Sequence, residues 1–546
     1  MLAHLIKRFR VLLTLAALAA VSNGIAGVWL LSLINHFVTA MSVRTKGDML
    51  EFAAAVVTLS GSQIAMYMMF EQLSQKALVE ARTRMASLVM SVELAHLESV
   101  GIKNVEAALG EHSTRLAEFF VQLPILLTNS ILIVGCIIYM GMLSPRATAI
   151  AGSVILLGAV GYYLAQSKAL ARFQSLARVQ AELHEHFRAM LNGAKELRLN
   201  RPKRESFARD LLGRDIERAR RERVAGMWLF HLAAGWGRLL VFALLGLVIF
   251  APFATVQIMT GFALVLVFMI NPLQTLLGSI PEAGLARVAS QEIDAVARGL
   301  RFETPPSVHS TAIAAPLRRI TLRNVTYRYV RSDEDASTPG GVFKVGPIDL
   351  NLFPGEITFL IGGNGSGKTT WAKLLTGLYR PEGGQVCWND SVVGEEQREA
   401  YRQRFSAVFC DSHLFLHVAG VGQSDLDARA NRLLRRLRLD DKVEVRDGAF
   451  STRALSQGQR KRLALLVALL EERPCLVLDE WAADQDPEFK EIFYREILPE
   501  LKALGKMVVV ISHDDRYFGV ADHLVRMEDG RQIAVSRASS ASTAVA

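Results

Sequence analysis

The chain has 546 residues, of which 51% are hydrophobic and 21% are charged, and its mean hydropathy is +0.25. This composition excludes a soluble globular protein of average type, so part of the chain is expected to lie in a membrane. The four cysteines show no CxxC or Cys/His spacing, so neither a disulfide framework nor a zinc site is expected. Basic residues between hydrophobic runs explain the net charge of +9, so a nucleic-acid partner is not expected either.

Six hydrophobic runs are long enough to cross a bilayer, whose core needs about 20 apolar residues per helix. They cover residues 11–34, 52–70, 119–142, 147–165, 227–251 and 258–280. Lys7, Arg8 and Arg10 precede the first run, so the positive-inside rule places the N-terminus in the cytoplasm. The alternative for this run is a cleaved signal peptide, but the apolar stretch continues past LAALAA through GIAGVWLLSLI, which favours an uncleaved span.

Two long basic segments follow the second and the fourth run, and we expect both to be cytoplasmic. They contain few glycines or prolines, and their apolar residues recur at helical spacing. The membrane helices are therefore predicted to continue well beyond the bilayer.

The composition changes at residues 304–316, TPPSVHSTAIAAP, which are small, polar and rich in proline. We therefore expect a transmembrane domain over 1–302 and a linker over 303–318. A second domain is expected over 319–535, followed by a disordered tail over 536–546.

A glycine-rich run, GGNGSGKTT, lies between the strand-like ITFLI and the helix-forming WAKLLTGL. Strand, glycine loop and helix in this order predict a P-loop, in which backbone N–H groups and a helix N-terminus hold phosphates. Lys368 is expected to neutralise the β- and γ-phosphates, and Thr369 to offer its hydroxyl to Mg²⁺. The phosphate-binding residues predicted from this run are Gly362, Asn364, Gly365, Ser366, Gly367, Lys368, Thr369 and Thr370.

Two further stretches complete a candidate hydrolytic site. PCLVLDE reads as a buried strand that ends in Asp479, expected to hold Mg²⁺ through water, and Glu480, expected to polarise the attacking water. In isolation this heptapeptide would be a strand end with a solvated acidic pair, but the preceding P-loop favours the catalytic interpretation. In LSQGQ, Ser456 and the Gly458 amide begin a periodic helix and predict a second phosphate-binding terminus.

The motifs GGNGSGKT, LSQGQ, CLVLDE and ISHDD resemble, in this order, those of an ATP-binding cassette (ABC) domain. With six preceding spans, the chain is similar to the half-transporters among ABC exporters. The resemblance implies a six-span α-helical domain of the type IV exporter kind followed by an α/β P-loop domain, with ATP and Mg²⁺ as cofactors. It also implies a homodimer, because the signature serine and glycine of one subunit complete the ATP site of the other.

The same resemblance assigns further residues. Tyr329 matches the aromatic residue that stacks on adenine, although it could be an ordinary alternating strand residue. His513 matches the switch histidine near the γ-phosphate, and Asp486 matches the aspartate that connects the two sites. Gln459 of the signature is placed with the nucleotide-binding residues.

Two positions depart from the family pattern. Cys410 stands where the family usually has a glutamine that senses Mg²⁺ and water, and a thiol cannot replace a carboxamide. Asp411 could take over the metal contact, or Glu480 and His513 could suffice without it; Cys410 could also fill a small apolar gap or, less favoured, serve a redox role. Gln457 replaces a signature glycine, and little effect is expected because Ser456 and Gly458 remain.

The segments DEWAADQDP, FSAVFCDSHLF and ISHDDRYF resemble those of the bacterial cyclic-peptide and siderophore-peptide exporters, of the pyoverdine-precursor or microcin exporter type. This resemblance implies export of a peptide across the bacterial inner membrane, with the nucleotide-binding domain in the cytoplasm and with periplasmic or outer-membrane partners left open. The alternatives are a lipid or multidrug flippase and a membrane-anchored ATPase that signals without moving a solute.

Arg238 lies about eleven residues, or roughly 16 Å, into the fifth predicted span. It could face a water-filled cavity and meet a substrate carboxylate, but the favoured hypothesis is a position near the interface with its head in water. His231, Trp228 and Trp236 are likewise interpreted as interfacial and are not assigned to a substrate. The family fold implies that turns of both long loops press on the nucleotide domains, and residues 96–109 and 190–199 are the candidates.

Overall fold

A computed structural model of the chain describes residues 7–39, 45–250, 255–300, 316–330, 342–418 and 425–537. The chain divides into two compact units. The first comprises Met1–Leu88 and Lys103–Gly299, and the second comprises Val89–Ile102 and Leu300–Ala546. A short piece of the first long loop therefore groups with the C-terminal unit. The domain boundary expected at 304–316 lies outside the described residues, apart from Pro316.

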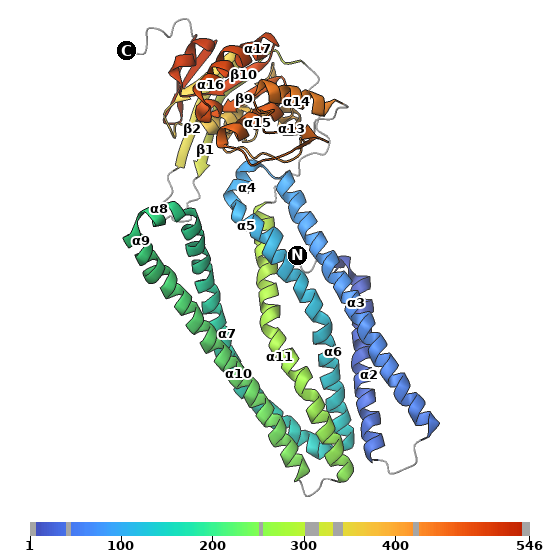
Figure 1. Ribbon diagram of the computed structural model, residues 1–546. Coiled ribbons are helices and arrows are strands. Elements are labelled where there is room, and N and C mark those ends of the chain that lie inside the picture. Colours follow the sequence, from blue (N-terminus) through green and yellow to red (C-terminus); the bar gives the residue numbers. More distant parts are fainter. Residues whose placement is uncertain are drawn as a thin grey trace. The chain divides into compact units, whose positions relative to one another are not determined.

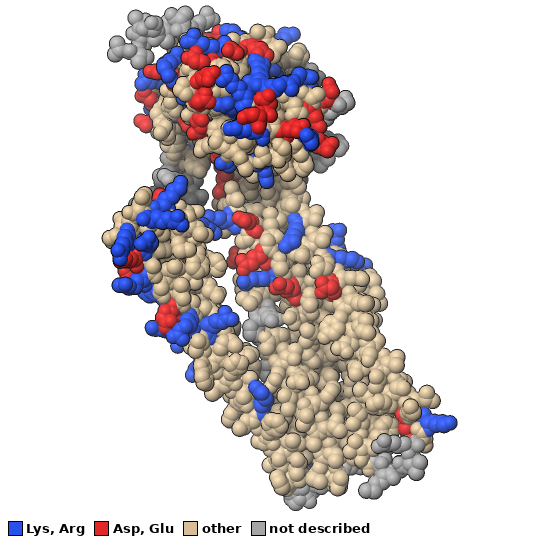
Figure 2. All heavy atoms as spheres, viewed as in Figure 1, with Lys and Arg blue, Asp and Glu red and all other residues tan. Residues whose placement is uncertain are grey.

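The first unit is a set of long helices (Figure 1). Within the described residues, six of them are long and apolar enough to cross a membrane, which confirms the six predicted spans. They are α2 (Arg10–Thr39), α3 (Lys46–Ser91), α6 (Ser113–Leu143), α7 (Pro145–Asn192), α10 (Arg214–Ile249) and α11 (Val256–Gly299). Figure 2 shows few charged side chains over the half of this unit that holds the α10–α11 connection, as a lipid-facing surface requires.

Close approach of helices α2 and α6 depends on glycine. A Cβ atom at Gly24 would lie 2.7 Å from Ile131 Cγ2, and one at Gly135 would lie 2.6 Å from Val28 Cγ2. Small residues at such contacts let two backbones pack closely where lipid provides no hydrophobic drive. The start of α7 is set by Ser144, whose hydroxyl accepts a hydrogen bond from the Ala147 amide.

The helices extend beyond a bilayer, as predicted from the two long loops. Helix α3 has 46 residues and α7 has 48. At about 1.5 Å per residue each is roughly 70 Å long, more than twice the hydrocarbon core of about 30 Å. The C-terminal end of α7 is joined to the N-terminal end of α10 by α8 (Ala194–Leu199), α9 (Arg201–Ser206) and a π-helical turn (Phe207–Gly213).

The described part of the second unit has two main sheets and a small two-stranded sheet of β7 (Val445–Arg446) and β8 (Ala449–Phe450) (Figure 1). The larger has the order β12-β11-β3-β10-β9-β6, in which the strands from β11 to β6 run parallel and β12 is antiparallel. These strands are β3 (Ile357–Gly362), β6 (Phe405–Val408), β9 (Cys475–Asp479), β10 (Met507–Ile511), β11 (His523–Glu528) and β12 (Arg531–Arg537). Strand β12 includes Ser536 and Arg537, so the expected tail does not begin at 536; residues 538–546 lie outside the described residues.

The smaller sheet is antiparallel, with the order β2-β1-β4-β5. Its strands are β1 (Ile320–Val330), β2 (Val342–Leu352), β4 (Gly383–Trp388) and β5 (Ser391–Val392). The helices of the unit are α4 (Leu94–Val100), α12 (Lys368–Leu375), α13 (Glu395–Arg402), α14 (Leu426–Arg436), α15 (Gln457–Leu470), α16 (Pro487–Ile492) and α17 (Leu498–Ala503). Six apolar spans followed by an α/β unit confirm the predicted fold class.

The larger sheet brings three motifs to one edge. Strand β10 pairs with both β3 and β9 in parallel, so the carboxyl ends of all three strands meet there. β3 ends at Gly362, β9 at Asp479 and β10 at Ile511. Ligands bind at this edge in parallel α/β sheets.

Candidate active site

The loop after β3 has the backbone of a phosphate cradle. Gly362 and Gly367 have φ angles of +152° and +93°. A Cβ at Gly362 would lie 2.2 Å from the Met527 carbonyl oxygen, and one at Gly367 would lie 3.0 Å from Val345 Cγ2. Glycine is therefore required at both positions for this conformation and this close approach. The loop ends at the N-terminus of α12, where a helix favours bound anions.

Lys368 is buried at the start of α12. Its ammonium donates hydrogen bonds to the carbonyl oxygens of Gly362 and Gly363, at 3.0 and 2.9 Å, and lies 3.9 Å from Glu480 Oε1. Burial lowers the pKa of Lys368, and the charge of Glu480 opposes this effect. The ammonium thus crosses the loop and faces the Glu480 carboxylate, which follows β9 two strands away in the sheet.

Thr369 and Asp479, the two residues predicted to hold Mg²⁺, are in direct contact. Thr369 Oγ1 donates a hydrogen bond of 2.9 Å to Asp479 Oδ2. Asp479 is only 1% exposed, and its Oδ1 has no hydrogen-bond partner among the described residues. Burial raises the pKa of this carboxyl above its usual range. A buried, unsatisfied carboxylate oxygen beside a hydroxyl fits Mg²⁺, which takes oxygen ligands and usually keeps only one or two carboxylates.

Glu480 follows β9 in a left-handed conformation, with φ 48° and ψ 32°. Its amide donates to the Ile511 carbonyl oxygen at 3.1 Å, and its Oε1 lies 2.9 Å from His513 Nε2. A left-handed backbone is uncommon for a residue other than glycine and persists where the surroundings fix it. The fold therefore brings Lys368, Thr369, Asp479, Glu480 and His513 together, as the motifs predict.

Cys410 is the one exposed cysteine among the four, the others being buried. Partial burial, followed by the charges of Asp479, Asp411 and Glu480, raises the pKa of its thiol. Strand β6, which ends two residues before Cys410, pairs in parallel with β9, so Cys410 lies at the same edge of the sheet as Asp479. A raised pKa keeps the sulfur as a neutral thiol at physiological pH, which disfavours the redox interpretation because the thiolate is the reactive form.

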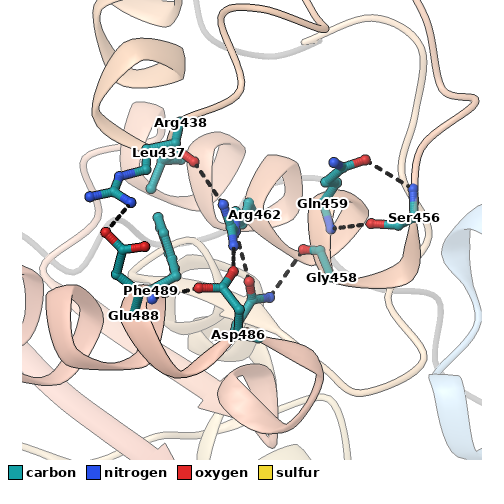
Figure 3. A network of polar contacts seen from close by, with 10 residues as sticks. Leu437, Arg438, Ser456, Gly458, Gln459, Arg462, Asp486, Glu488 and Phe489 are labelled. Carbon is teal, nitrogen blue, oxygen red and sulfur yellow. Dashed lines mark hydrogen bonds and ion pairs between the residues drawn. The ribbon is translucent and has the colours of Figure 1, made fainter.

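The signature serine begins helix α15 with a capping box (Figure 3). Ser456 Oγ accepts from the Gln459 amide at 3.3 Å, and the Ser456 amide donates to Gln459 Oε1 at 3.1 Å. Gln459 thus shapes the helix terminus. A Cβ at Gly458 would lie 2.5 Å from the Asp484 carbonyl oxygen, so only glycine lets the loop after β9 approach this turn.

Asp486 caps α16 and belongs to the same network (Figure 3). Its carboxylate accepts from the Phe489 amide at 2.8 Å and forms an ion pair with Arg462, whose guanidinium lies 3.8 Å above the Phe489 ring. The hydrogen bond from the Phe489 backbone N–H lowers the pKa of Asp486 most, and the positive charge of Arg462 lowers it further. Gln485 joins the signature turn to this group by a 3.0 Å bond to the Gly458 carbonyl oxygen.

Lys461, Gln457 and Asp484 of this region were not among the predicted site residues. Lys461, largely buried, donates to the Glu480 carbonyl oxygen at 3.0 Å and pairs with Asp484 at 2.7 Å. Gln457, the replacement of a signature glycine, donates to the same Asp484 carboxylate at 3.1 Å. The only sequence signal was the unusual segment DEWAADQDP, which holds Asp484.

Tyr329 lies at the end of β1, opposite Phe343 on β2, and its side chain is 38% exposed. The Phe343 ring is 3.3 Å from where a Cβ of Gly367 would lie, so this strand pair borders the phosphate loop. An exposed aromatic ring at this border has the surface that stacking on a base requires.

Helix α4 is joined to the P-loop helix within the second unit. Lys373 of α12 lies 2.8 Å from Glu98, which also accepts a hydrogen bond from Tyr379. Glu93, just before α4, pairs with Arg398 at 2.8 Å. Burial, followed by the bond to Glu98, raises the pKa of Tyr379 well above its usual range. Glu98 falls in the segment 96–109 expected from the sequence, and Glu93 precedes it.

Comparisons with known proteins show which family the chain is similar to. Residues 345–483 match the family described as ABC transporter. The chain is 33% identical over 472 residues to the ATP-binding protein SyrD of Pseudomonas syringae pv. syringae, covering 84% of this chain and 82% of that protein. It is 28% identical over 291 residues to an ATP-dependent lipid A-core flippase of Alkalilimnicola ehrlichii, covering 50% of this chain and 46% of the flippase. It is 31% identical over 231 residues to the macrolide export ATP-binding/permease protein MacB of Burkholderia cenocepacia, covering 39% and 32%.

Six membrane-crossing helices and a P-loop unit with paired acidic residues define an integral membrane ATPase that couples hydrolysis to transport. The chain belongs to the ABC transporter family, with an exporter-type layout. It is a multi-pass protein of the inner membrane, and its ATP-binding domain lies in the cytoplasm.

Proposed function

We propose that the protein exports a peptide, of the cyclic or siderophore-precursor class, across the inner membrane as a homodimer. The observation that carries the peptide assignment is the segment Asp479–Pro487, DEWAADQDP, with its peptide-exporter-like sequence and its own polar network around Asp484. The similarity to SyrD along 84% of the chain supports a shared architecture, whereas the flippase similarity covers half of it.

The need for two copies is supported by the arrangement of the motifs. Ser456 is bonded within its own helix turn, and among the contacts of the described residues none joins it to Lys368 or Thr369. A second copy would bring its Ser456 and Gly458 to the phosphate loop of the first. In each copy, we propose that the membrane domain extends to residue 302, the linker covers 303–318 and the cassette domain covers 319–535.

In the proposed mechanism the residues of one cassette have separate roles in ATP binding and hydrolysis. The loop from Gly362 to Thr370 and Lys368 bind the ATP phosphates, and Tyr329 stacks on the base. Thr369 and Asp479 hold Mg²⁺, which when bound neutralises phosphate charge. Glu480 orients the attacking water and accepts its proton, while His513 holds the Glu480 carboxylate in place through their 2.9 Å contact.

The test is ATP-dependent accumulation of a labelled pyoverdine-precursor peptide in inside-out vesicles, with Glu480→Gln as the hydrolysis-deficient variant and Glu488→Gln as a surface-carboxylate control. We expect accumulation with wild type and the control, and its loss in Glu480→Gln, whose ATP turnover should fall by about a hundredfold or more. Equal vesicle signals, with ATPase activity intact in wild type, would contradict peptide export.

A lipid flippase is the second candidate, favoured only by the partial similarity to the lipid A-core flippase. It predicts that lipid, and not peptide, stimulates the ATPase activity. A signalling ATPase predicts ATP hydrolysis in vesicles without accumulation of any solute.

A further inference from the structure

We propose that a pocket among α7, α10 and α11 binds one acidic side chain of the exported peptide. This inference rests on the proposed function and names the chemistry that the membrane unit recognises. The pocket has a volume of about 200 Å³. Its polar lining consists of Tyr162, His231, Arg238 and Gln274, and Phe230 and Leu273 are among its apolar walls.

The depth of Arg238 is the first observation. Helix α10 ends at Ile249, eleven residues after Arg238, so the guanidinium-bearing residue lies about 16 Å from that helix end. If the hydrocarbon core of about 30 Å begins at this helix end, Arg238 lies near its middle. Tyr162 lies seventeen residues after the start of α7 and Ile270 fourteen after the start of α11, about 25 and 21 Å from the same end. All three distances are shorter than the hydrocarbon core of about 30 Å, so we infer that the pocket lies within the membrane.

The second observation is that the positive charge of Arg238 has no partner among the described residues. No aspartate or glutamate lines the pocket, and among the described residues Arg238 has neither an ion pair nor a hydrogen bond. A charged side chain at this depth is costly unless it is paired or hydrated in a cavity. A guanidinium offers two parallel N–H donors that match a carboxylate, so an incoming carboxylate would supply the partner.

The arrangement of donors supports an acidic ligand. His231 and Arg238 are seven residues apart, two helical turns, and both face the pocket. Tyr162 from α7 and Gln274 from α11 add a hydroxyl and a carboxamide from the other two walls. Four side chains that can donate hydrogen bonds thus converge on one space.

The volume and the apolar walls of the pocket limit the size and the chemistry of the ligand that it can hold. A ligand pocket for a drug-sized molecule usually has about 300–1,000 Å³, so about 200 Å³ accommodates one side chain and not a whole peptide. Phe230, Val241, Ile270 and Leu273 surround the polar group with hydrocarbon. The fit is to a glutamate or aspartate side chain flanked by apolar groups.

Close packing fixes the wall between α7 and α10. A Cβ at Gly161 would lie 2.8 Å from Trp236 Nε1, and one at Gly158 would lie 2.3 Å from Leu240 Cδ1. Gly237 differs, because nothing lies within 4 Å of a Cβ there and the residue lines the pocket. Gly235 has the same free space but is not part of the lining, so it provides a matched control.

The test is equilibrium binding of dansylated probes to the full-length protein in nanodiscs. Binding is measured by fluorescence energy transfer from tryptophan to the dansyl group. The probes are dansylated decanoyl-Ala-Ser-Glu-amide and its Gln counterpart, which differ only in the charge. Wild type should bind the Glu probe about tenfold more tightly, as expected for hydrogen bonds to a charged group. Arg238→Gln should remove this preference, Arg238→Lys should retain part of it, and Arg146→Gln, a cation outside the pocket, should retain all of it.

A second pair of variants tests the space without changing charge. Gly237→Val should weaken both probes by about tenfold, as a side chain fills part of the pocket, whereas Gly235→Val should not. Monodisperse elution of every variant shows that a loss of binding is not a loss of fold. Equal binding of the two probes to wild type would overturn the assignment.

Further outcomes distinguish a lipid anion from a peptide carboxylate as the ligand, and the pocket proposal from the proposal of peptide export. If dansyl-phosphatidylglycerol binds with the same dependence on Arg238 and the Glu probe does not, the pocket is a lipid site and the proposal is wrong. A preference for the Glu probe without ATP-dependent vesicle accumulation would support the pocket and reject peptide export. Accumulation by a protein that shows no such preference would support export and reject the pocket.

Discussion

Lys461 of the signature helix forms an ion pair of 2.7 Å with Asp484, and the same ammonium donates to the Glu480 backbone carbonyl at 3.0 Å. Trp481, buried next to Glu480, donates in turn to the Lys461 carbonyl oxygen at 2.6 Å. The turn that carries the proposed catalytic carboxylate is therefore bonded to α15 from both directions. Because Glu480 has a positive φ, this network is the physical means of holding an uncommon backbone conformation.

Replacing Lys461 by Met should loosen that turn. We expect kcat for ATP to fall by about tenfold to a hundredfold, because small displacements of a catalytic group cost this much. KM for ATP should change by less than about twofold, since Lys461 is outside the phosphate loop. Steady-state ATPase kinetics measure both constants.

The controls separate positioning from stability. Lys461→Arg keeps the charge and the donors and should retain most of the activity, and Arg460→Gln changes its neighbour in sequence without touching the network. If Lys461→Met lowered the melting temperature but left kcat unchanged, Lys461 would be only a structural residue.

Much of the fold followed from patterns with a single physical cause. A hydrocarbon core imposes a minimum apolar length, so the six spans could be located, and α3 and α7 could be expected to run beyond the membrane. Buried parallel strands read as continuous apolar runs, as in LVLD before Glu480 and VVVI before His513. The grouping of residues 89–102 with the C-terminal unit could not be foreseen, because it involves contacts, among them two ion pairs, between residues 275 and 305 positions apart.

The site was predictable where backbone geometry restricts the residue type. Gly362, Gly367 and Gly458 lie where a Cβ would collide with neighbouring atoms. The role of Gln457 was not predictable, since a replaced signature glycine gave no hint of its bond to Asp484. The position of Arg238 relative to the bilayer stays a prediction, because apolar length alone does not fix where a long helix enters the bilayer.

Cys410 should be the cysteine that a maleimide labels in the folded protein, since Cys136, Cys387 and Cys475 are buried. Its raised pKa means that labelling should accelerate at a higher pH than for a free thiol, because the thiolate reacts. A non-hydrolysable ATP analogue with Mg²⁺ should slow labelling, because Cys410 follows β6 at the same sheet edge as Asp479 at the end of β9. Mass spectrometry of labelled peptides measures each rate, and the Cys410→Ser variant identifies the background.

The function of this position is tested by Cys410→Gln, which restores the residue usual in related cassettes. ATPase activity should be retained or increased, because the carboxamide offers a donor and an acceptor that the thiol lacks. A collapse of activity in this variant would show that the thiol itself is required.

Asp479 should make the protein less stable as the pH rises. Burial raises its native pKa above the unfolded value, so between these two values the native state holds more protons, and stability falls as pH increases through that window. Asp479→Asn should remove this contribution and raise the melting temperature in EDTA, while abolishing ATP hydrolysis. Calorimetric scans from about pH 4 upward measure the slope, which Asp441→Asn, an exposed carboxylate, should leave unchanged. An unaltered slope in Asp479→Asn would contradict the role of burial.

The contacts of Glu98 with Lys373 and Tyr379 should determine how firmly α4 is held on the nucleotide unit. Both members of the ion pair are partly buried, so Glu98→Gln should cost about 1–3 kcal/mol and accelerate amide hydrogen exchange in residues 94–100 by about tenfold or more. The control is Glu106→Gln, which removes an exposed carboxylate from a neighbouring helix. Because Lys373 follows the phosphate loop on α12, exchange in 94–100 should also slow when ATP binds to wild type, and this effect should weaken in Glu98→Gln. Unchanged exchange in both experiments would show that α4 is held by its apolar contacts, Leu94 and Ala95 against the core, and not by the ion pair.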